Sequence, residues 1–247
     1  MPHFFVPPDQ IRENRFFLSE GESRHLSQVL RKAPGDELQL FDGQGGLYRG
    51  VIEKVSAGRV EGRLETLSPA VKRPYALRLF QGLPKGDKFE WILEKMTELG
   101  AAEIVPVHTE RCVAHLSSEK APARLERWKK IVLSAAKQSG QPQVPEVRPP
   151  MSFREALARA GRNGLTLVPW ESETDMGLKK VLREQRGRAE SVNVFIGPEG
   201  GFTADEVSLA LQGGAVSVTL GPAILRTETA GLFVASALLY EWGEQTK

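Results

Sequence analysis

The chain has 247 residues, enough for one large domain or two smaller ones, and its 40% hydrophobic content is ordinary for a globular protein. Its net charge of +2 permits a nucleic-acid partner but is lower than a dedicated duplex-binding domain would carry. Its single cysteine, Cys112, excludes an internal disulfide and is typical of a reducing compartment.

The sequence contains no apolar run long enough to cross a membrane. Its first residues, MPHFFVPPDQ, lack the charged segment and apolar core of a signal peptide. We therefore expect a cytoplasmic location and no membrane partner.

Residues 1–72 have the pattern of a small β-rich domain. Short strands are expected at residues 4–6, 16–18, 37–41, 47–55 and 60–67, separated by turns that contain Gly and Asp. Residues 22–30 are expected to form one helix with Leu26, Val29 and Leu30 facing inward. This spacing predicts a small barrel.

The segment DGQGG at residues 42–46 has two interpretations. A glycine-rich loop after a strand is also how Rossmann-type methyltransferases hold their cofactor, but that loop must lead into a helix. Here it leads into LYRGVIEKV, which has the composition of a strand. A hairpin turn is therefore the better interpretation.

Residues 68–74, SPAVKRP, form the best linker candidate. A strand at 76–81 follows, and Asp87 with Glu90 resembles a capping box that opens a helix ending at Gly100. A further strand is expected at 103–107. The apolar residues of this helix keep helical spacing at Phe89, Ile92, Leu93, Met96 and Leu99.

His108, Cys112 and His115 lie close together in sequence. A structural zinc site usually needs four ligands, and no fourth ligand is evident nearby. We expect no metal site.

Residues 122–139 predict a helix with one apolar and one basic side. The basic side is either solvated or in contact with phosphates. A strand at 165–168 and a helix at 178–182 follow, and residues 230–242 predict an apolar helix buried on more than one side, as in a dimer interface. The first helix carries Leu125, Trp128, Val132 and Ala135 on its apolar stripe, and Arg124, Arg127, Lys130 and Lys137 elsewhere.

Two glycine-rich loops occupy the last third of the chain. FIGPEGGFTADEV (195–207) and TLGPAILRTETAGLF (219–233) each follow a short apolar run, at 192–196 and 215–220, and each leads into a helical pattern. Thr203 and Glu206 have the spacing of a capping box. Alternating strands and helices from about residue 75 predict an α/β domain whose parallel sheet binds a ligand at the carboxyl ends of its strands.

The second loop ends in Arg226, Thr227, Glu228 and Thr229, an unusually polar start for an apolar helix. Either loop alone would be explained by a tight turn and a helix cap, but the two together favour a ligand site. GxxxxGK[ST] and GxSxG motifs are absent. Composition and spacing thus indicate a two-domain α/β protein with a small-molecule site.

Five stretches, taken together, resemble one family. They are residues 24–46, 81–113, 126–140, 196–206 (IGPEGGFTADE) and 220–230 (LGPAILRTETA). They are similar, in the same order, to the bacterial 16S ribosomal RNA uracil-N3 methyltransferases of the SPOUT superfamily. The resemblance implies a PUA-like RNA-binding β-barrel domain at 1–72 and a SPOUT α/β methyltransferase domain with a C-terminal trefoil knot at 73–247. It also implies a homodimer, with the small ribosomal subunit as substrate.

The same resemblance implies the site residues. Arg226 is the candidate for stabilising charge on the base, and Glu228 is the candidate proton acceptor or cofactor contact. Arg24, His25, Arg31 and Lys85 are candidate RNA contacts, although His25 could equally be a packed histidine. The implied S-adenosylmethionine contacts are Val168, Pro169, Trp170, Glu171, Ile196, Gly197, Pro198, Glu199, Gly200, Gly201, Leu220, Gly221, Ile224, Leu225, Arg226 and Thr227.

The chain departs from the family pattern where arginines are usual, at His3, Gln141, Gln143 and Ala223, and Lys137 stands where an acidic residue is common. Arginines are the usual phosphate contacts, so these changes bear on RNA binding. Relatives that methylate ribose carry Ser-Leu-Asn in the last motif, whereas this chain has Arg-Thr-Glu, which favours a base as target. The alternatives are a methyltransferase of another RNA or of ribose 2′-OH, and a non-catalytic RNA-binding relative.

Overall fold

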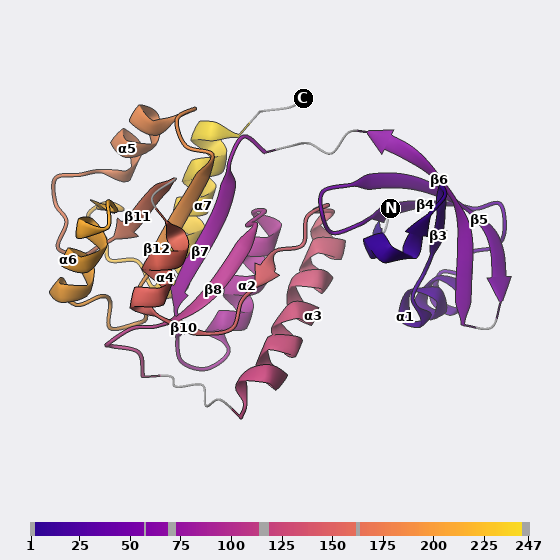
Figure 1. Cartoon of the computed structure of the whole chain (residues 1–247), viewed down its shortest axis with the longest axis horizontal. Coiled ribbons are helices and arrows are strands. Elements are labelled where there is room, and N and C mark those ends of the chain that lie inside the picture. The colour runs from indigo at the N-terminus through magenta and orange to yellow at the C-terminus, as the bar shows by residue number, and fades with distance from the viewer. Residues whose placement is uncertain (1–2, 57, 69–72, 114–118, 162–163, 244–247) are drawn as a thin grey trace. The chain divides into compact units, whose positions relative to one another are not determined.

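The computed structural model describes residues 3–56, 58–68, 73–113, 119–161 and 164–243. Contacts divide the chain into two compact units, one of Met1–Lys72 with Leu133–Val144 and the other of Arg73–Val132 with Pro145–Lys247. The elements of both are labelled in Figure 1. The expected linker at 68–74 lies mainly outside the described residues, as does His115.

The first unit is built on a mixed sheet of six strands in the order β1-β4-β5-β6-β3-β2. β1 runs parallel to β4, and the other pairs are antiparallel. Phe4, Phe16, Leu26, Leu40 and Ile52 are among its buried core. The strands are β1 (His3–Phe5), β2 (Ile11–Arg12), β3 (Arg15–Phe17), β4 (Glu37–Phe41), β5 (Leu47–Ser56) and β6 (Arg59–Ser68), with a short 3-10 helix at Pro8–Gln10.

The expected helix at 22–30 is two shorter elements, α1 (Glu20–Arg24) and a π-helical turn (His25–Val29). Leu26 is fully buried as predicted, but Val29 is 67% exposed and Leu30 is 37% exposed. The inward orientation predicted for Val29 and Leu30 is therefore wrong. A π turn advances by a smaller angle per residue than an α turn, which moves Val29 off the buried face, and the helix ends before Leu30.

The hairpin interpretation of DGQGG is confirmed. Asp42 Oδ1 accepts hydrogen bonds from the backbone N–H groups of Gln44 (2.7 Å) and Gly46 (2.9 Å), which closes the turn. The chain then continues directly into β5, which pairs back onto β4. The element directly after this loop is a strand and not a helix, so its amides are not presented as a cofactor-binding loop would require.

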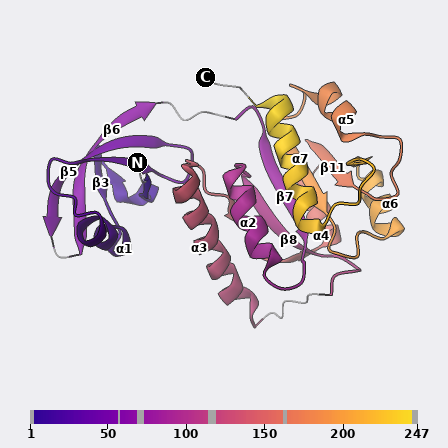
Figure 2. The ribbon, with the colours of Figure 1, turned by 180° about the vertical axis from the view of Figure 1, so that it is seen from behind.

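The second unit is built on a parallel sheet in the order β10-β8-β7-β12-β11-β13, with β9 beside β8. α2 and α7 pack together over one face (Figure 2). The strands are β7 (Ala76–Gly82), β8 (Glu103–His108), β9 (Glu146–Val147), β10 (Met151–Ser152), β11 (Leu165–Pro169), β12 (Ser191–Ile196) and β13 (Val216–Val218). The helices of the second unit are α2 (Lys88–Glu98), α4 (Phe153–Ala160), α5 (Leu178–Gln185), α6 (Ala204–Gln212) and α7 (Thr227–Trp242). α3 (Ala121–Ser139) is divided between the units, because its residues from Leu133 onward belong to the first.

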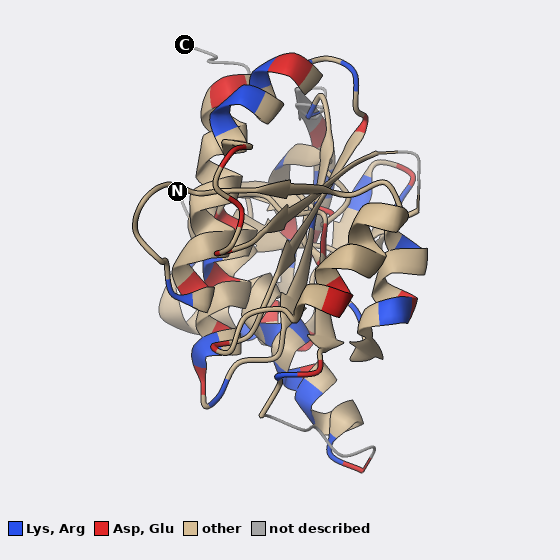
Figure 3. Cartoon of the chain, turned by 90° about the vertical axis from the view of Figure 1, so that its left-hand side faces the viewer, with Lys and Arg blue, Asp and Glu red and all other residues tan. Residues whose placement is uncertain are grey.

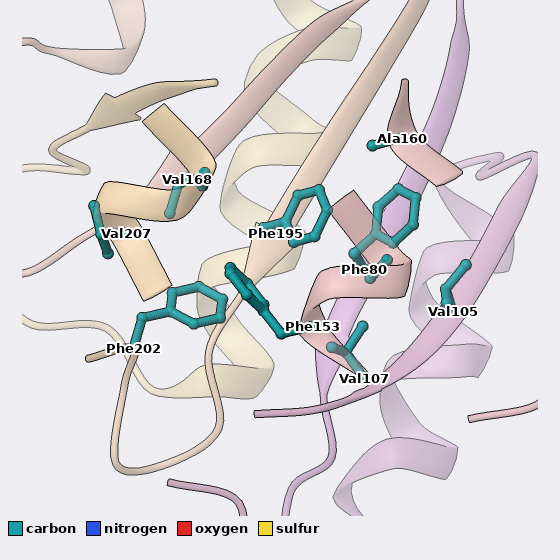
Figure 4. Close-up of a cluster of buried hydrophobic side chains, with 11 residues drawn as sticks. Phe80, Val105, Val107, Phe153, Ala160, Val168, Phe195, Phe202 and Val207 are labelled. Atoms are coloured by element: carbon teal, nitrogen blue, oxygen red, sulfur yellow. The ribbon is translucent and has the colours of Figure 1, made fainter. Parts of the chain in front are cut away.

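The opposite face of this sheet carries an aromatic core under α4 and α6 (Figure 4). The rings of Phe80 and Phe195, on adjacent strands, stack with centroids 4.4 Å apart, and Phe153 of α4 meets Phe195 edge-on at 5.8 Å. Because side chains alternate along a strand, Leu79, next to Phe80, instead faces α7, where a Cβ on Gly231 would lie 3.5 Å from it. Charged residues lie mostly on the helices and loops around the sheet (Figure 3).

The start of α2 was placed correctly, but its capping box is wrong. Asp87 is the N-cap, yet its side chain makes no cap hydrogen bond to any described residue. Glu90 instead accepts hydrogen bonds from Arg124 (3.1 Å) and Arg127 (2.6 Å) of α3, which engages two residues of the basic side of that helix. Gly100 ends α2 with a φ of 73°, a conformation that favours glycine.

Cys112 is buried, and its sulfur lies 3.2 Å from the hydroxyl of Thr109. Within the described ranges, no three His, Cys, Asp or Glu side chains gather where they could hold a metal ion. Among these same residues, no helix combines the length and apolar character needed to cross a membrane.

Candidate active site

A cavity of about 430 Å³ opens at the carboxyl ends of three neighbouring strands. Its walls are the loops that follow β11, β12 and β13, together with the first residues of α7. These strands are adjacent in the sheet, in the order β12-β11-β13. Loops far apart in sequence therefore meet at one edge, which is the usual ligand position in an open parallel sheet.

The structure brings together nearly all the residues that the resemblance implied for the cofactor. All of them line the cavity except Val168, which is fully buried in the core, and Gly200, which faces Arg111. Six further residues line the cavity that were not among the implied contacts, although Pro222 and Ala223 lie within the implied loop at 220–228: Lys88, Phe202, Thr219, Pro222, Ala223 and Ala230.

The loop after β12 can only be built with glycine at two points. A Cβ on Gly197 would lie 2.9 Å from the carbonyl carbon of Gly201, which is too close for any side chain. Gly201 itself has a φ of 68° and donates its N–H to the carbonyl of Pro198 (2.9 Å). The sharp reversal of GPEGG leaves backbone at the cavity wall.

Side chains of α6 and of the loop after β8 hold this glycine loop in place. The capping box of α6 is confirmed, because Thr203 and Glu206 bond each other's backbone N–H groups. Glu206 is 8% exposed and also accepts from the N–H of Glu110 (2.9 Å), while Arg111 Nη1 donates to the carbonyl of Gly200 (3.0 Å). Spacing in the sequence gave no signal for these contacts with the loop after β8.

The loop after β11 is fixed by one carboxylate. Glu173 accepts hydrogen bonds from Ser217 Oγ of β13 and from the backbone N–H groups of Met176 and Asp175, both at 3.0 Å. The bond from Ser217, followed by those from the two amides, holds the pKa of Glu173 below its usual range. Glu173 therefore stays ionised at neutral pH and ties this wall of the cavity to β13.

A buried hydrogen-bond chain joins α7 to the middle of the sheet. Gln81, fully buried at the end of β7, donates from Nε2 to Thr227 Oγ1 (2.8 Å), and Thr227 donates to the carbonyl of Gly197 (2.5 Å). The chain fixes the first residue of α7 against the glycine loop.

The two candidate catalytic residues differ in position. Arg226 is the N-cap of α7 and is an exposed lining residue of the cavity. The Glu228 side chain is only 17% exposed, lies outside the set of lining residues, and is 3.6 Å from Lys88 Nζ. Its Oε2 has no hydrogen-bond partner among the described atoms. Lys88, not Glu228, faces the cavity.

The candidate RNA contacts are split between the units. Arg24, His25 and Arg31 are all exposed in the first unit, where Arg24 pairs with Glu20 (2.7 Å) and the ring of His25 lies 6.1 Å from that of Phe4. Lys85, in the second unit, is exposed and donates its backbone N–H to Glu199 Oε1 (3.1 Å).

The structure shows the contacts or location of three positions that depart from the family pattern. Lys137 forms an ion pair with Glu22, so its charge is compensated within the first unit. Gln143 forms β-bridges with Gly43 and Gln44 of the DGQGG turn. Ala223 is part of the cavity wall.

Family models and similar proteins of comparable length indicate one family. Residues 71–239 match the model of an RNA methyltransferase domain, and residues 18–65 match that of an RNA methyltransferase PUA domain. Ribosomal RNA small subunit methyltransferase E of Bacillus subtilis is 34% identical over 98% of this chain and 97% of its own length. The enzyme of that name from Synechocystis is 37% identical over 91% of this chain and 73% of its own length.

Solved structures agree. A ribosomal RNA small subunit methyltransferase E from Neisseria gonorrhoeae, crystallised with S-adenosylmethionine, superposes with a TM-score of 0.86 at 34% identity over the full length of both chains. A methyltransferase from Legionella pneumophila, also in complex with this cofactor, gives 0.82 at 30% identity over 97% of each chain. The chain thus belongs to the ribosomal RNA small subunit methyltransferase E family.

Proposed function

We propose that this protein transfers the methyl group of S-adenosylmethionine to N3 of a uracil in the 16S RNA of the small ribosomal subunit. The observation that carries the proposal is the cavity at the three loops, which unites the GPEGG and LGPAILRTE segments at one edge of the sheet. Family membership supports the reaction class, and the Arg-Thr-Glu sequence of the last motif supports a base as target.

The cavity suits the cofactor in size and in lining. Its volume of about 430 Å³ falls within the range of roughly 300–1,000 Å³ that is typical of small-molecule sites. Trp170, Ile196 and Leu225 give it apolar walls, and the glycine loop leaves backbone accessible where a Cβ would clash. We propose that the lining residues implied by the resemblance hold the cofactor, which supplies an activated methyl group when bound.

Methyl transfer needs the uracil nitrogen held in line with the methyl carbon and the sulfur, which is a problem of positioning. Uracil N3 must also lose its proton to become nucleophilic, so a nearby cation that stabilises the uracil anion favours the reaction. We assign this role to Arg226, an exposed residue of the cavity wall. Glu228 does not line the cavity and lies 3.6 Å from Lys88, which does, so the geometry favours an action of Glu228 through Lys88.

A paired uracil does not present N3, so the target nucleotide must be splayed out of its helix. We propose that the first unit is a PUA-like RNA-binding barrel, with Arg24, His25 and Arg31 as RNA contacts, and that Lys85 contacts RNA beside the cavity. The mixed sheet and the match to a PUA model support this assignment.

We further propose a C-terminal trefoil knot in residues 73–247 and a homodimer. The path of α7 supports the knot, because α7 leaves the edge strand β13 yet packs on β12, β7, α2 and α5. Exposed Trp91 of α2 (43%) and Phe233 (45%) and Tyr240 (75%) of α7 support an interface between copies. A ribosomal substrate would place the protein in the cytoplasm.

The test is to incubate the protein with labelled S-adenosylmethionine and small ribosomal subunits that lack the modification, and then to identify the labelled nucleoside. Label in 3-methyluridine is the expected result. Label in a 2′-O-methyl nucleoside would show that the methyl acceptor is a ribose hydroxyl. Cofactor binding without label would indicate that another RNA is the substrate. Failure to bind the cofactor at all would favour a non-catalytic RNA-binding protein.

A further inference from the structure

Lys88 stands between two carboxylates at the border of the cavity. Its Nζ lies 2.9 Å from Glu199 Oε1 and 3.6 Å from Glu228 Oε2. Glu199 belongs to the glycine loop after β12, and Glu228 lies in the first turn of α7. Lys88 is the first residue of α2 and lines the cavity. One ammonium group thus touches two different walls of the proposed cofactor site.

The charges of this cluster are mutually dependent. The hydrogen bond to Glu199 raises the pKa of Lys88, and Glu228 adds to this effect. Burial raises the pKa of Glu199, but the hydrogen bond from Lys88, the backbone hydrogen bonds and the charge of Lys88 together outweigh it, so the pKa of Glu199 lies below its usual range. Lys88 and Glu199 are therefore ionised near neutral pH, and without Lys88 the side chains of Glu199 and Glu228 would both lose their nearby cation.

Glu228 makes the arrangement more than a surface ion pair. Lys88 and Glu199 are each about one third exposed (37% and 34%), and a pair of that kind alone contributes little. Glu228 is 17% exposed, and its Oε2 lacks a hydrogen-bond partner in the described chain. A mostly buried carboxylate that loses its nearby cation is unfavourable, because no other described charge compensates it.

Glu199 is held at a second point, by the loop that precedes α2. Its Oε1 also accepts the backbone N–H of Lys85 (3.1 Å), three residues before Lys88. The loop before α2 and Lys88 therefore both orient the side chain of Glu199, while Lys88 also reaches Glu228 of α7. The glycine loop follows β12 and α2 follows β7, and these two strands are neighbours in the sheet, which brings Glu199 within reach of Lys88.

We propose that Lys88 is a positioning residue for the cofactor, which holds the glycine loop and the first turn of α7 at the separation that S-adenosylmethionine requires. The inference rests on the proposed function, since it presumes that the cavity binds this cofactor. It also gives Glu228 a role: Glu228 fixes Lys88 from the side of α7.

The experiment compares Lys88→Met with Lys88→Arg by isothermal titration with S-adenosylmethionine in the absence of RNA. Loss of the cation is expected to raise the Kd about tenfold, because both walls lose their link, whereas arginine can bridge two carboxylates and should restore the Kd to within about threefold of wild type. Lys95→Met is the matched control, since Lys95 lies on the same helix but pairs with Glu94 and Glu98. Its Kd should equal that of wild type.

Kinetic measurements distinguish a positioning role of Lys88 from a general loss of structure. In Lys88→Met the KM for the cofactor should rise with the Kd, while kcat at saturating cofactor falls by less than the KM rises. Glu228→Gln should weaken binding in wild type but have a smaller effect in the Lys88→Met background, because the partner is already gone. If Lys88→Met fails to fold, Glu199→Gln gives the same test from the other side of the pair.

The outcomes distinguish the inference from the function on which it rests. Wild-type protein that binds no cofactor would overturn both. Wild-type binding with an unchanged Kd in Lys88→Met would overturn only the role of Lys88. A raised Kd that Lys88→Arg does not restore, together with a lowered thermal midpoint, would show that the lysine supports the fold and would also overturn it.

Discussion

Thr227 donates a 2.5 Å hydrogen bond to the carbonyl of Gly197, thirty residues earlier in the chain. The same hydroxyl accepts from Gln81 Nε2 at 2.8 Å, so one side chain connects β7, the loop after β12 and the start of α7. Gln81 is fully buried and Thr227 is 6% exposed, and a buried network fixes geometry more strongly than an exposed one. The first turn of α7 and the glycine loop therefore move together.

Thr227→Val tests this connection, because valine keeps the shape of threonine and removes the hydroxyl. We expect a loss of about 1–3 kcal/mol in the free energy of unfolding, since Gln81 Nε2 and the Gly197 carbonyl lose a partner. The Kd for S-adenosylmethionine should rise by about tenfold, a change of about 1.4 kcal/mol. Urea unfolding and calorimetric titration measure the two effects. Thr229→Val, at an exposed position two residues on, is the control and should change neither.

Arg226→Ala should reduce turnover while it preserves the fold. Arg226 is exposed, and its side chain makes no cap hydrogen bond to the residues described, so little stability depends on it. Removing a preorganised charge at a reacting centre typically lowers kcat by about 10²–10³. Single-turnover methylation of small subunits measures this. Arg183→Ala, whose side chain pairs with Glu241 on α7 (3.6 Å), should keep wild-type kcat. Undiminished turnover in Arg226→Ala would remove the residue from the mechanism.

Gly197→Ala should abolish cofactor binding and destabilise the protein. The added Cβ would lie 2.9 Å from the carbonyl carbon of Gly201, and backbone cannot yield as a flexible side chain can. We expect overpacking to cost about 1–3 kcal/mol. Gly177→Ala is the matched control: it lies after β11 with a φ of −71°, and its Cβ would meet nothing within 4 Å. Comparable losses in both variants would contradict the steric argument.

Glu103 predicts a specific dependence of stability on pH. Burial raises its pKa, but the hydrogen bonds and the charges of Arg159 and Arg148 together outweigh this and lower the pKa below the ordinary value of 4.5. Because the folded-state pKa is below the unfolded one, the stabilising contribution is present above about pH 4.5 and is lost as the pH falls through the folded-state pKa.

Glu103→Gln should therefore destabilise the protein by about 1–3 kcal/mol at pH 7, and by less as the pH falls toward the acid limit, where wild-type Glu103 is itself protonated. Urea unfolding at pH 7 and at pH 3–4 measures the difference. Glu94→Gln, on an exposed face of α2, should follow wild type at each pH. A difference between Glu103→Gln and wild type that is independent of pH would show that charge is not the cause.

Features of the site that depend on short-range rules were predicted from the sequence. The capping box of Thr203 and Glu206, the two loops that follow buried strands, and the hairpin at DGQGG were each correct, because their partners lie within a few residues. Predictions from short-range rules were wrong at two places. A π-helical turn formed where an α-helix was expected, so Val29 lies at the surface. Glu90 accepts hydrogen bonds from two arginines of α3 and therefore does not cap α2.

The sequence by itself determined the family, the parallel α/β unit and most residues of the loops that line the cavity, because these follow from periodicity, turn chemistry and recognisable motifs. Only the tertiary structure decided how the loops are held. Lys88 meets Glu199 across 111 positions and Gln81 meets Thr227 across 146. Such partners are set by the order β7-β12-β11-β13, and strand order is fixed by packing over the whole sheet, which no spacing along the chain records.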